Sequence, residues 1–297
     1  MMPSLPDEIQ SIPHQENISF GKLTTLGVGG NCKILFEPIN EDQVYALIRT
    51  FRQEGWSYRI LGGGSNLVIL SDIEEPVIRL NFPKVLKIQG QEITAPANFG
   101  HIRLSQAAAE QGLSGMEYAA GIPGTTGGAL HMNAGAYGRE LVEILSRYRY
   151  LTPEGDVIDT APQTENFGYR WSHLGPGYVA LGFTVRLTPG DKQLIQAQVE
   201  SNRLKRGSSQ PLSKRNAGCI FKNPQGHSAG RLIDQAGLKG FRIGDAEVSS
   251  EHANFLINHG QATAREFYEL MIQVQSKVQL QYGITLEPEV EVWGKMT

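Results

Sequence analysis

Three positions in the sequence carry side chains whose types suit acid–base and charge-stabilising chemistry. Arg170 stands between Tyr169 and Trp171, Cys219 follows a glycine at the start of a predicted strand, and Glu289 lies near the C-terminus. A guanidinium can clamp a carboxylate or a developing enolate, a thiol can donate a proton or act as nucleophile, and a carboxylate can act as acid, base or orienting group. Each also has a structural alternative: an exposed arginine stacked on Trp171, a small buried cysteine, and a glutamate on a solvated strand face.

Two glycine-rich segments could hold a flat or phosphorylated ligand against the backbone. Residues 121–138 contain six glycines among polar, uncharged side chains, which is too many for an ordinary helix or packed strand. Residues 62–66 read Gly-Gly-Gly-Ser-Asn between two predicted strands, and they are either a diphosphate cradle or a flexible hairpin loop. Neither segment matches a Walker A or Rossmann pattern, because the lysine pair and the strand–glycine–helix order are missing. We therefore predict one extended nucleotide cofactor lying across both segments.

Composition excludes several classes of protein. The chain has 297 residues, a formal net charge of −3 and two cysteines. This length suits two or three domains, and the charge gives no footprint for nucleic acid or for an anionic membrane. We expect no disulfide framework, no metal site and no membrane span, because the cysteine spacing and the apolar runs are wrong for them. Residues 1–10 are acidic and contain two prolines, so we expect no signal peptide and a reducing cytoplasm.

Hydrophobic periodicity and turn residues predict an α+β chain. Asn40 should cap a helix that carries Val44, Leu47, Ile48 and Phe51, and Thr263 and Glu266 should form a capping box. Further helices are predicted at 102–111, 191–206, 229–236 and up to 282. Strands are predicted at 33–37, 58–61, 67–70, 77–80, on both sides of 89–90, and at 141–151, 157–159, 178–187, 220–222, 254–258 and 287–293. The stretch 207–211 predicts a domain boundary, and Arg203, Lys205 and Arg206 before it are either solvated or phosphate-binding.

Seven segments, taken in order, resemble those of a known family. They are residues 25–30, 61–68, 120–138, 167–170, 217–224, 248–258 and 286–294. Any one of them could arise by chance, but the ordered set is similar to the UDP-N-acetylenolpyruvoylglucosamine reductases, also called UDP-N-acetylmuramate dehydrogenases or MurB. The resemblance implies a vanillyl-alcohol-oxidase-type (PCMH-type) FAD-binding region of two subdomains, residues 1–82 and 83–207, followed by a substrate-binding domain, residues 208–297.

The resemblance also implies a reaction. A family member uses FAD and NADPH to reduce UDP-N-acetylglucosamine enolpyruvate to UDP-N-acetylmuramate, in the synthesis of peptidoglycan precursors. Its partners are these small molecules, without nucleic acid or membrane, and we expect a monomer. Another flavin oxidoreductase of the same fold and a non-catalytic nucleotide-binding module remain the alternatives.

The same resemblance assigns roles to individual residues. Arg170 matches the catalytic arginine, Cys219 the proton donor and Glu289 the catalytic glutamate. The positions that match FAD contacts are Gly62, Gly63, Gly64, Ser65, Asn66, Gly121, Gly124, Thr125, Thr126, Gly128, Asn133 and Gly135, and those that match substrate contacts are Tyr137, Arg203, Asn223 and His252. The chain departs from the family pattern at Cys219, where serine is common, and at Glu291, where arginine is common. It also has no tyrosine-loop insertion after Arg170, which indicates the shorter subtype.

Overall fold

The structure is a computed structural model that describes residues 5–296, so residues 1–4 and 297, at the outer ends of the first and third predicted domains, lie outside the description. Contacts divide the chain into two compact units. Unit 1 comprises the residues up to 16, 34–62 and 75–204, and unit 2 comprises residues 17–33, 63–74 and those from 205 onward. The three predicted domains, with boundaries after residues 82 and 207, remain a prediction.

Helices and strands alternate without a regular pattern, and the predicted α+β class is confirmed. The helices are α1 (Asp7–Gln10), α2 (Glu41–Gln53), α3 (His101–Glu110), α4 (Thr126–His131), α5 (Lys192–Ser209), α6 (Ala229–Gln235) and α7 (Ala264–Tyr282). The strands up to residue 140 are β1 (His14–Ser19), β2 (Asn31–Phe36), β3 (Arg59–Ile60), β4 (Leu67–Ile69), β5 (Val77–Ile78), β6 (Lys87–Gln89), β7 (Glu92–Pro96), β8 (Leu113–Ser114), β9 (Gly135–Ala136) and β10 (Arg139–Glu140). The later strands are β11 (Leu145–Leu151), β12 (Val157–Thr160), β13 (Phe167–Gly168), β14 (Trp171–Ser172), β15 (Val179–Arg186), β16 (Thr188–Pro189), β17 (Arg215–Cys219), β18 (Arg242–Ile243), β19 (Ala246–Val248), β20 (Phe255–Asn258) and β21 (Glu291–Trp293).

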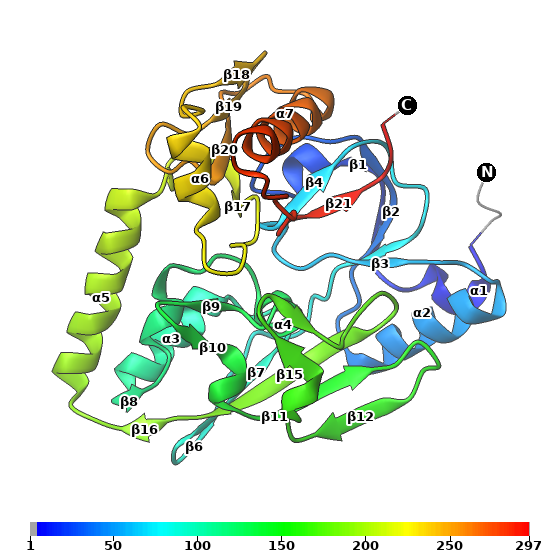
Figure 1. The fold of residues 1–297 in the computed structure, drawn as a ribbon. Helices are drawn as coiled ribbons and strands as arrows, with labels where there is room; N and C mark the ends of the chain where they lie inside the picture. Colours follow the sequence, from blue (N-terminus) through cyan, green and yellow to red (C-terminus); the bar gives the residue numbers. More distant parts are fainter. Residues whose placement is uncertain (1–4, 297) are drawn as a thin grey trace. The chain divides into compact units, whose positions relative to one another are not determined.

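Unit 1 is built on a five-stranded antiparallel sheet with the order β12-β11-β15-β7-β6 (Figure 1). Every second residue of β15 is buried, as expected of a strand with one face in a core. Phe183 and Val185 pack in a core with α3 and α4, whereas Val179 and Leu181 pack in a second core with α2. One face of a single strand therefore holds both cores of unit 1 together.

The second core of unit 1 contains the predicted capped helix. The Asn40 side chain accepts a hydrogen bond of 2.9 Å from the Gln43 N–H at the start of α2, which confirms the predicted cap. The buried face of α2 consists of the predicted apolar residues, together with Thr50. Beside it, β5 pairs in parallel with β2 on one side and β3 on the other.

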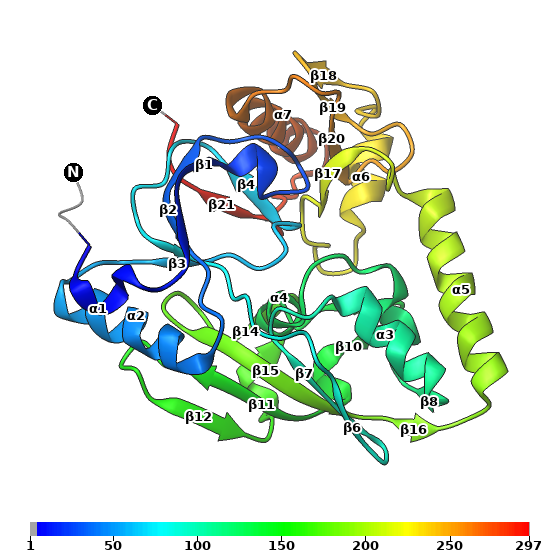
Figure 2. The ribbon, with the colours of Figure 1, turned by 180° about the vertical axis from the view of Figure 1, so that it is seen from behind.

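Unit 2 contains a four-stranded antiparallel sheet with the order β17-β20-β19-β18 (Figure 2). Helix α7 packs against β18 and β19, and its buried side chains join one core with those of α6 and β20. The predicted capping box is present: the Thr263 hydroxyl accepts from the Glu266 N–H, and the Glu266 carboxylate accepts from the Thr263 N–H. A separate pair of parallel strands, β4 and β21, also belongs to unit 2.

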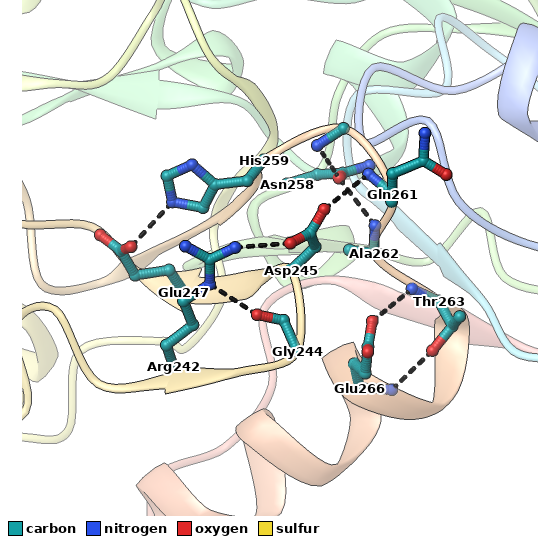
Figure 3. A network of polar contacts seen from close by, with 11 residues as sticks. Arg242, Gly244, Asp245, Glu247, Asn258, His259, Gln261, Ala262, Thr263 and Glu266 are labelled. Atoms are coloured by element: carbon teal, nitrogen blue, oxygen red, sulfur yellow. Dashed lines mark hydrogen bonds and ion pairs between the residues drawn. The ribbon is translucent and has the colours of Figure 1, made fainter.

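Polar side chains fix the turns at the edge of this sheet (Figure 3). The Asp245 carboxylate accepts hydrogen bonds from the Arg242 guanidinium and from the Gln261 N–H. Asn258, at the end of β20, is 4% exposed; its oxygen accepts from the N–H groups of Gly260 and Ala262 at 2.7 and 3.1 Å, and its amide donates to the Leu26 carbonyl at 3.0 Å. One buried side-chain amide thus forms hydrogen bonds with three backbone groups, two of them just after β20 and one at Leu26.

We expect Asn258→Ala to lower the free energy of unfolding by about 2–4 kcal/mol, because it leaves several backbone groups without partners. Urea unfolding followed by circular dichroism measures the change. Gln261→Ala is the matched control: this neighbouring side chain is exposed, and its removal should change the free energy by less than about 0.5 kcal/mol. Equal effects of the two substitutions would show that the Asn258 contacts do not matter for stability.

Five of the predicted elements differ from the structure. The strand predicted at 141–151 begins only at Leu145, after a 3-10 helix at Leu141–Glu143. Helix α5 was predicted to end at Arg206 but continues through Gly207 to Ser209, and both Ser208 and Ser209 donate their hydroxyls to the Lys205 carbonyl. Pro211 then prevents further helix. The glycine-rich segment 121–138 contains a helix, α4, although its glycine content argued against one. The strand predicted at 220–222 is found earlier in the chain, as β17 (Arg215–Cys219). The strand predicted at 287–293 begins only at Glu291.

Candidate functional site

The loop of residues 63–66 in unit 2 presents unused backbone donors. Gly64 has a φ of +63°, and a Cβ there would lie 2.2 Å from the Leu23 carbonyl oxygen, so only glycine fits. The Thr25 N–H donates to the Gly64 carbonyl at 3.0 Å and anchors the loop. Within residues 5–296, the N–H groups of Gly63, Gly64, Ser65 and Asn66 have no hydrogen-bond acceptor. Four consecutive free N–H groups suit an anion such as a diphosphate, so these residues fit the predicted FAD contact.

In unit 1, the glycines of the segment 121–138 allow close packing. A Cβ on Gly127 would lie 3.0 Å from both the Cβ and the carbonyl oxygen of Ala97, so glycine lets α4 approach β7 directly. Two predicted FAD contacts have structural uses here. The Thr125 hydroxyl caps α4 by accepting from the Gly128 N–H, and the fully buried Thr126 hydroxyl donates to the Pro96 carbonyl at 2.5 Å. Gly62 also packs closely, because a Cβ there would lie 3.0 Å from the Thr125 hydroxyl oxygen.

Backbone strain in unit 1 is concentrated at predicted site residues. Four non-glycine residues of the described chain have positive φ, and three of them are Asn133 (41°), Tyr137 (55°) and Arg170 (57°). Such conformations cost about 1–3 kcal/mol each and cluster at functional sites. The fourth, Asn17, lies in unit 2 and was not a predicted site residue. The strain supports the assignment of this region as functional.

Arg170 occupies the tip of a short hairpin between β13 and β14. Its guanidinium lies over the ring of Tyr169, at 5.0 Å from the centroid, and not over Trp171 as the structural alternative assumed. The buried Asn133 holds this hairpin, because its amide donates to the Gly168 carbonyl at 3.1 Å and to the Glu140 carboxylate at 2.8 Å. Asn133, predicted as an FAD contact, therefore also positions the backbone that carries Arg170.

In unit 2, Cys219 and Glu289 lie on adjacent segments together with the loop of residues 63–66. The Glu289 N–H donates to the carbonyl of Ile220, the residue after Cys219, at 2.7 Å. The Asn66 amide donates to the Glu289 carbonyl at 3.2 Å, and the Asn66 carbonyl accepts from the Glu291 N–H. Glu289 precedes β21, so it does not share a strand face with Glu287 as expected; Glu287 is exposed and pairs with Lys222 at 3.5 Å.

A bulge sets the orientation of Cys219. The register of β17 against β20 shifts between Asn216 and Cys219, and Gly218 there has a φ of +78°. The Asn216 side chain accepts from the Gly218 N–H at 2.9 Å and stabilises the bulge. Cys219 is half-buried and forms no disulfide, so the structural alternative of a fully buried apolar cysteine does not hold. The other cysteine, Cys32, is buried.

Sequence reasoning missed Asn254, which fixes the segment after Cys219. Asn254 is 3% exposed; its oxygen accepts from the Phe221 N–H and its amide donates to the Phe221 carbonyl, at 3.1 and 2.8 Å. Its own carbonyl accepts from the Ile220 N–H. A buried asparagine with both amide groups on one backbone residue acts as a clamp. The sequence contains no local signal for it, because Asn254 lies 33 positions from Phe221.

The predicted substrate residues have different surroundings. His252, in unit 2, packs edge-on against Phe255, and burial, with the nearby positive charges of Lys239 and Arg206, lowers its pKa. Its Nδ1 accepts from the Asn254 N–H at 3.2 Å, so the neutral ring carries its proton on Nε2. Of the three cations Arg203, Lys205 and Arg206 singled out in the sequence, Arg206 is therefore the one that lies near His252.

Asn223, Arg203 and Tyr137 make local contacts. The Asn223 side chain accepts from the Ala229 N–H at 2.9 Å at the start of α6. Arg203, in unit 1, is exposed and forms a two-pronged ion pair with Glu200 on the same helix. Tyr137 is 51% exposed, and its hydroxyl donates a hydrogen bond of 3.2 Å to the Asn202 carbonyl. These three assignments remain predictions.

The structure also bears on Glu291, where the chain departs from the family pattern, and on metal sites and membrane-spanning helices. Glu291, at the position where the family commonly has arginine, accepts a hydrogen bond of 3.1 Å from the Trp293 indole N–H. Within residues 5–296, no group of three or more His, Cys, Asp or Glu side chains is placed to hold a metal ion. No helix of the same described range is long and apolar enough to cross a membrane.

Comparisons with known proteins agree with the fold and the motifs. Residues 32–161 match the model of the FAD binding domain family, and residues 210–293 match the C-terminal domain of UDP-N-acetylenolpyruvoylglucosamine reductase. The reductase of Synechococcus sp. (strain JA-3-3Ab) is 40% identical over 94% of this chain and 91% of its own, and that of Bacillus subtilis (strain 168) is 37% identical over 91% of each. The crystal structure of the Thermus caldophilus enzyme superposes with a TM-score of 0.82 at 37% identity, covering 95% of this chain and 99% of that one.

These matches confirm the resemblance and the predicted FAD-binding region followed by a C-terminal domain. The FAD-binding match covers the glycine loop at 62–66 and the segment 121–138, and the C-terminal match covers Cys219 and Glu289. Identity of 40% over nearly the whole chain is far above what a shared fold alone would give. The chain therefore belongs to the UDP-N-acetylenolpyruvoylglucosamine reductase family of FAD-dependent oxidoreductases.

Proposed function

We propose that this protein reduces UDP-N-acetylglucosamine enolpyruvate to UDP-N-acetylmuramate with NADPH as the reductant. The observation that carries the proposal is the backbone pairing in unit 2 between the segments of Cys219, Glu289 and Asn66, in a chain that matches the reductases from end to end. An acid, a carboxylate and a diphosphate-type loop on neighbouring segments are what a flavin-dependent reduction followed by protonation requires.

FAD is the cofactor for which the free N–H groups of residues 63–66 provide an anion site. When bound there, FAD would supply the hydride-transfer chemistry between NADPH and the enolpyruvyl double bond, and residues 63–66 would hold its diphosphate. The glycines at 62, 64 and 127 keep the backbone close-packed around the proposed binding segments, since a Cβ at each would meet a neighbouring atom at 3.0 Å or less.

Arg170 is the residue that we assign to charge stabilisation on the substrate. Hydride addition to the terminal carbon leaves negative charge on the carboxylate-bearing side, as an enolate. A guanidinium held by a strained hairpin needs little reorganisation, and such preorganised donors are worth about 3 kcal/mol of barrier. The Tyr169 ring beneath the guanidinium limits its freedom further.

Cys219 is the proposed proton donor to the α-carbon, and Glu289 the proposed orienting carboxylate. A thiol can hold a proton and release it, which is what this step requires of its donor. The Gly218 bulge and the Asn254 clamp fix the backbone on both sides of Cys219, so the thiol has few conformations to lose. Glu289 is held through its backbone, because its N–H donates to the Ile220 carbonyl and its carbonyl accepts from the Asn66 amide, and its carboxylate is the group that would orient the substrate or join a proton network.

His252, with its Nε2–H and with Arg206 and Lys239 near it, is the proposed contact for the substrate's diphosphate, because donors and positive charge favour that group. Asn223, Arg203 and Tyr137 are retained as further substrate contacts. Glu291 cannot replace an arginine as an anion ligand, so we propose that this chain binds the substrate without a cation at that position.

The test is turnover by the purified protein. We expect a yellow protein with a flavin spectrum, whose absorbance is bleached by NADPH and restored by the enolpyruvyl sugar without oxygen, with UDP-N-acetylmuramate detected by mass spectrometry. A protein that stays colourless after FAD addition would instead support a non-catalytic nucleotide-binding module. Flavin that is reduced by NADPH but not reoxidised by the sugar would support a different flavin oxidoreductase.

A further inference from the structure

The loop of residues 63–66 lacks a charge that a diphosphate would need. Its N–H groups carry only partial charges, and residues 63–70 contain neither lysine nor arginine. A diphosphate in a cofactor or nucleotide carries about two negative charges, and arginine binds phosphate oxygens with two parallel hydrogen bonds. A guanidinium near this loop would supply the missing positive charge.

Arg215, the first residue of β17, is such a guanidinium within unit 2. Its side chain lies against Gly27: a Cβ on that glycine would be 3.1 Å from both Cδ and Nη1 of Arg215. Gly27 has a φ of +71°, so both its conformation and the space that Arg215 occupies require glycine. The Arg215 side chain thus lies against the turn that begins at Thr24. In this turn the Thr24 hydroxyl accepts a hydrogen bond from the Gly27 N–H.

The same turn holds the loop. Thr25 donates its N–H to the Gly64 carbonyl at 3.0 Å, and its hydroxyl donates to the carbonyl of Asn216, the residue after Arg215, at 2.7 Å. Thr25 therefore ties the loop and the Arg215 strand to one point. Arg215 is exposed, and its guanidinium has no carboxylate partner or hydrogen-bond acceptor among residues 5–296.

We propose that Arg215 binds a diphosphate together with the free N–H groups of residues 63–66. The proposal rests on the proposed function, since it takes the loop to be a diphosphate site. Three diphosphates enter the proposed reaction, those of FAD, NADPH and the uridine nucleotide, and the chemistry that recognises them is shared. The position beside the FAD loop favours FAD as the source.

Titration of FAD-free protein with FAD and with riboflavin, which has no phosphate, tests the proposal. Arg215→Ala should weaken FAD binding about tenfold, as expected for one charge-assisted contact, and leave riboflavin binding unchanged. The loss should shrink at high salt, and Arg215→Lys should recover part of it. Lys214→Ala removes the same charge one residue earlier and should have no effect on FAD.

The second arm titrates the FAD-loaded variant with the uridine substrate, followed by the flavin spectrum. A selective loss of substrate binding, with FAD binding intact, would assign Arg215 to the uridine diphosphate. Unchanged binding of both ligands, or an equal loss of riboflavin binding, would overturn the inference. If the wild-type protein bound riboflavin as tightly as FAD, the loop itself would not be a diphosphate site, and the proposed placement of FAD would fail with it.

Discussion

Cys219→Ala should lower kcat for reduction of the enolpyruvyl sugar by about 10²–10⁴-fold, the range for removal of a general acid. Reduction of bound flavin by NADPH should continue at the wild-type rate, because no proton from Cys219 is needed there. Stopped-flow absorbance of the flavin separates the two half-reactions. The expected signature is normal bleaching by NADPH followed by very slow return of the oxidised spectrum on addition of the sugar.

Cys219→Ser is the matched control for this experiment. A hydroxyl can occupy the same position on the bulged strand, and serine is common there in the family, so measurable turnover should remain. Stability should be nearly unchanged in both variants, since the thiol is only half-buried. If the alanine variant reoxidised as fast as wild type, the proton would have to come from another group.

The largest expected effect of pH on stability involves His101, the first residue of α3. This histidine is fully buried, and both ring nitrogens lack a hydrogen-bond partner among the described residues. Burial lowers its pKa to about 4, from 6.5 in an unfolded chain. Below pH 6.5 the unfolded chain takes up a proton that the folded chain does not. Stability is therefore lost as the pH falls from 6.5 towards 4.

A shift of this size corresponds to about 3 kcal/mol of unfolding free energy between pH 7 and pH 4. We expect His101→Phe, which keeps a ring in the core, to remove that share of the pH dependence. Urea unfolding of both proteins at the two pH values gives the difference. His227→Phe, at an exposed position, should leave the pH dependence as in wild type. Parallel pH curves for wild type and His101→Phe would contradict the assignment.

Local rules were enough to predict the parts of the fold that depend on neighbouring residues. The cap at Asn40 and the box formed by Thr263 and Glu266 are contacts over three positions, and both are present. The predicted end of α5, at Arg206, was wrong because glycine and serine are unfavourable in helices only on average. Here hydroxyl contacts to the Lys205 carbonyl occupy acceptors at the helix end.

The residue types of the candidate site were named from the sequence, whereas its geometry was not. Residues 62–66 were interpreted from composition as either a phosphate loop or a flexible hairpin loop, and the N–H groups of residues 63–66 that make no hydrogen bond are compatible with the first interpretation. The clamp by Asn254 and the bulge at Gly218 could not be found, since each depends on strands that meet only after folding. For the same reason, the sequence could not show that Arg206 lies near His252.

The pairing of β4 with β21 has a consequence for how the chain matures during synthesis. Asn66, in the loop of residues 63–66, and Glu289, at the other end of the contact, are 223 positions apart. Strand β4 follows the loop directly. Its partner in this two-stranded sheet is β21, the last described strand of the chain. The loop therefore cannot acquire these contacts until β21 has left the ribosome. Nascent chains that lack β21 should be unable to retain the cofactor.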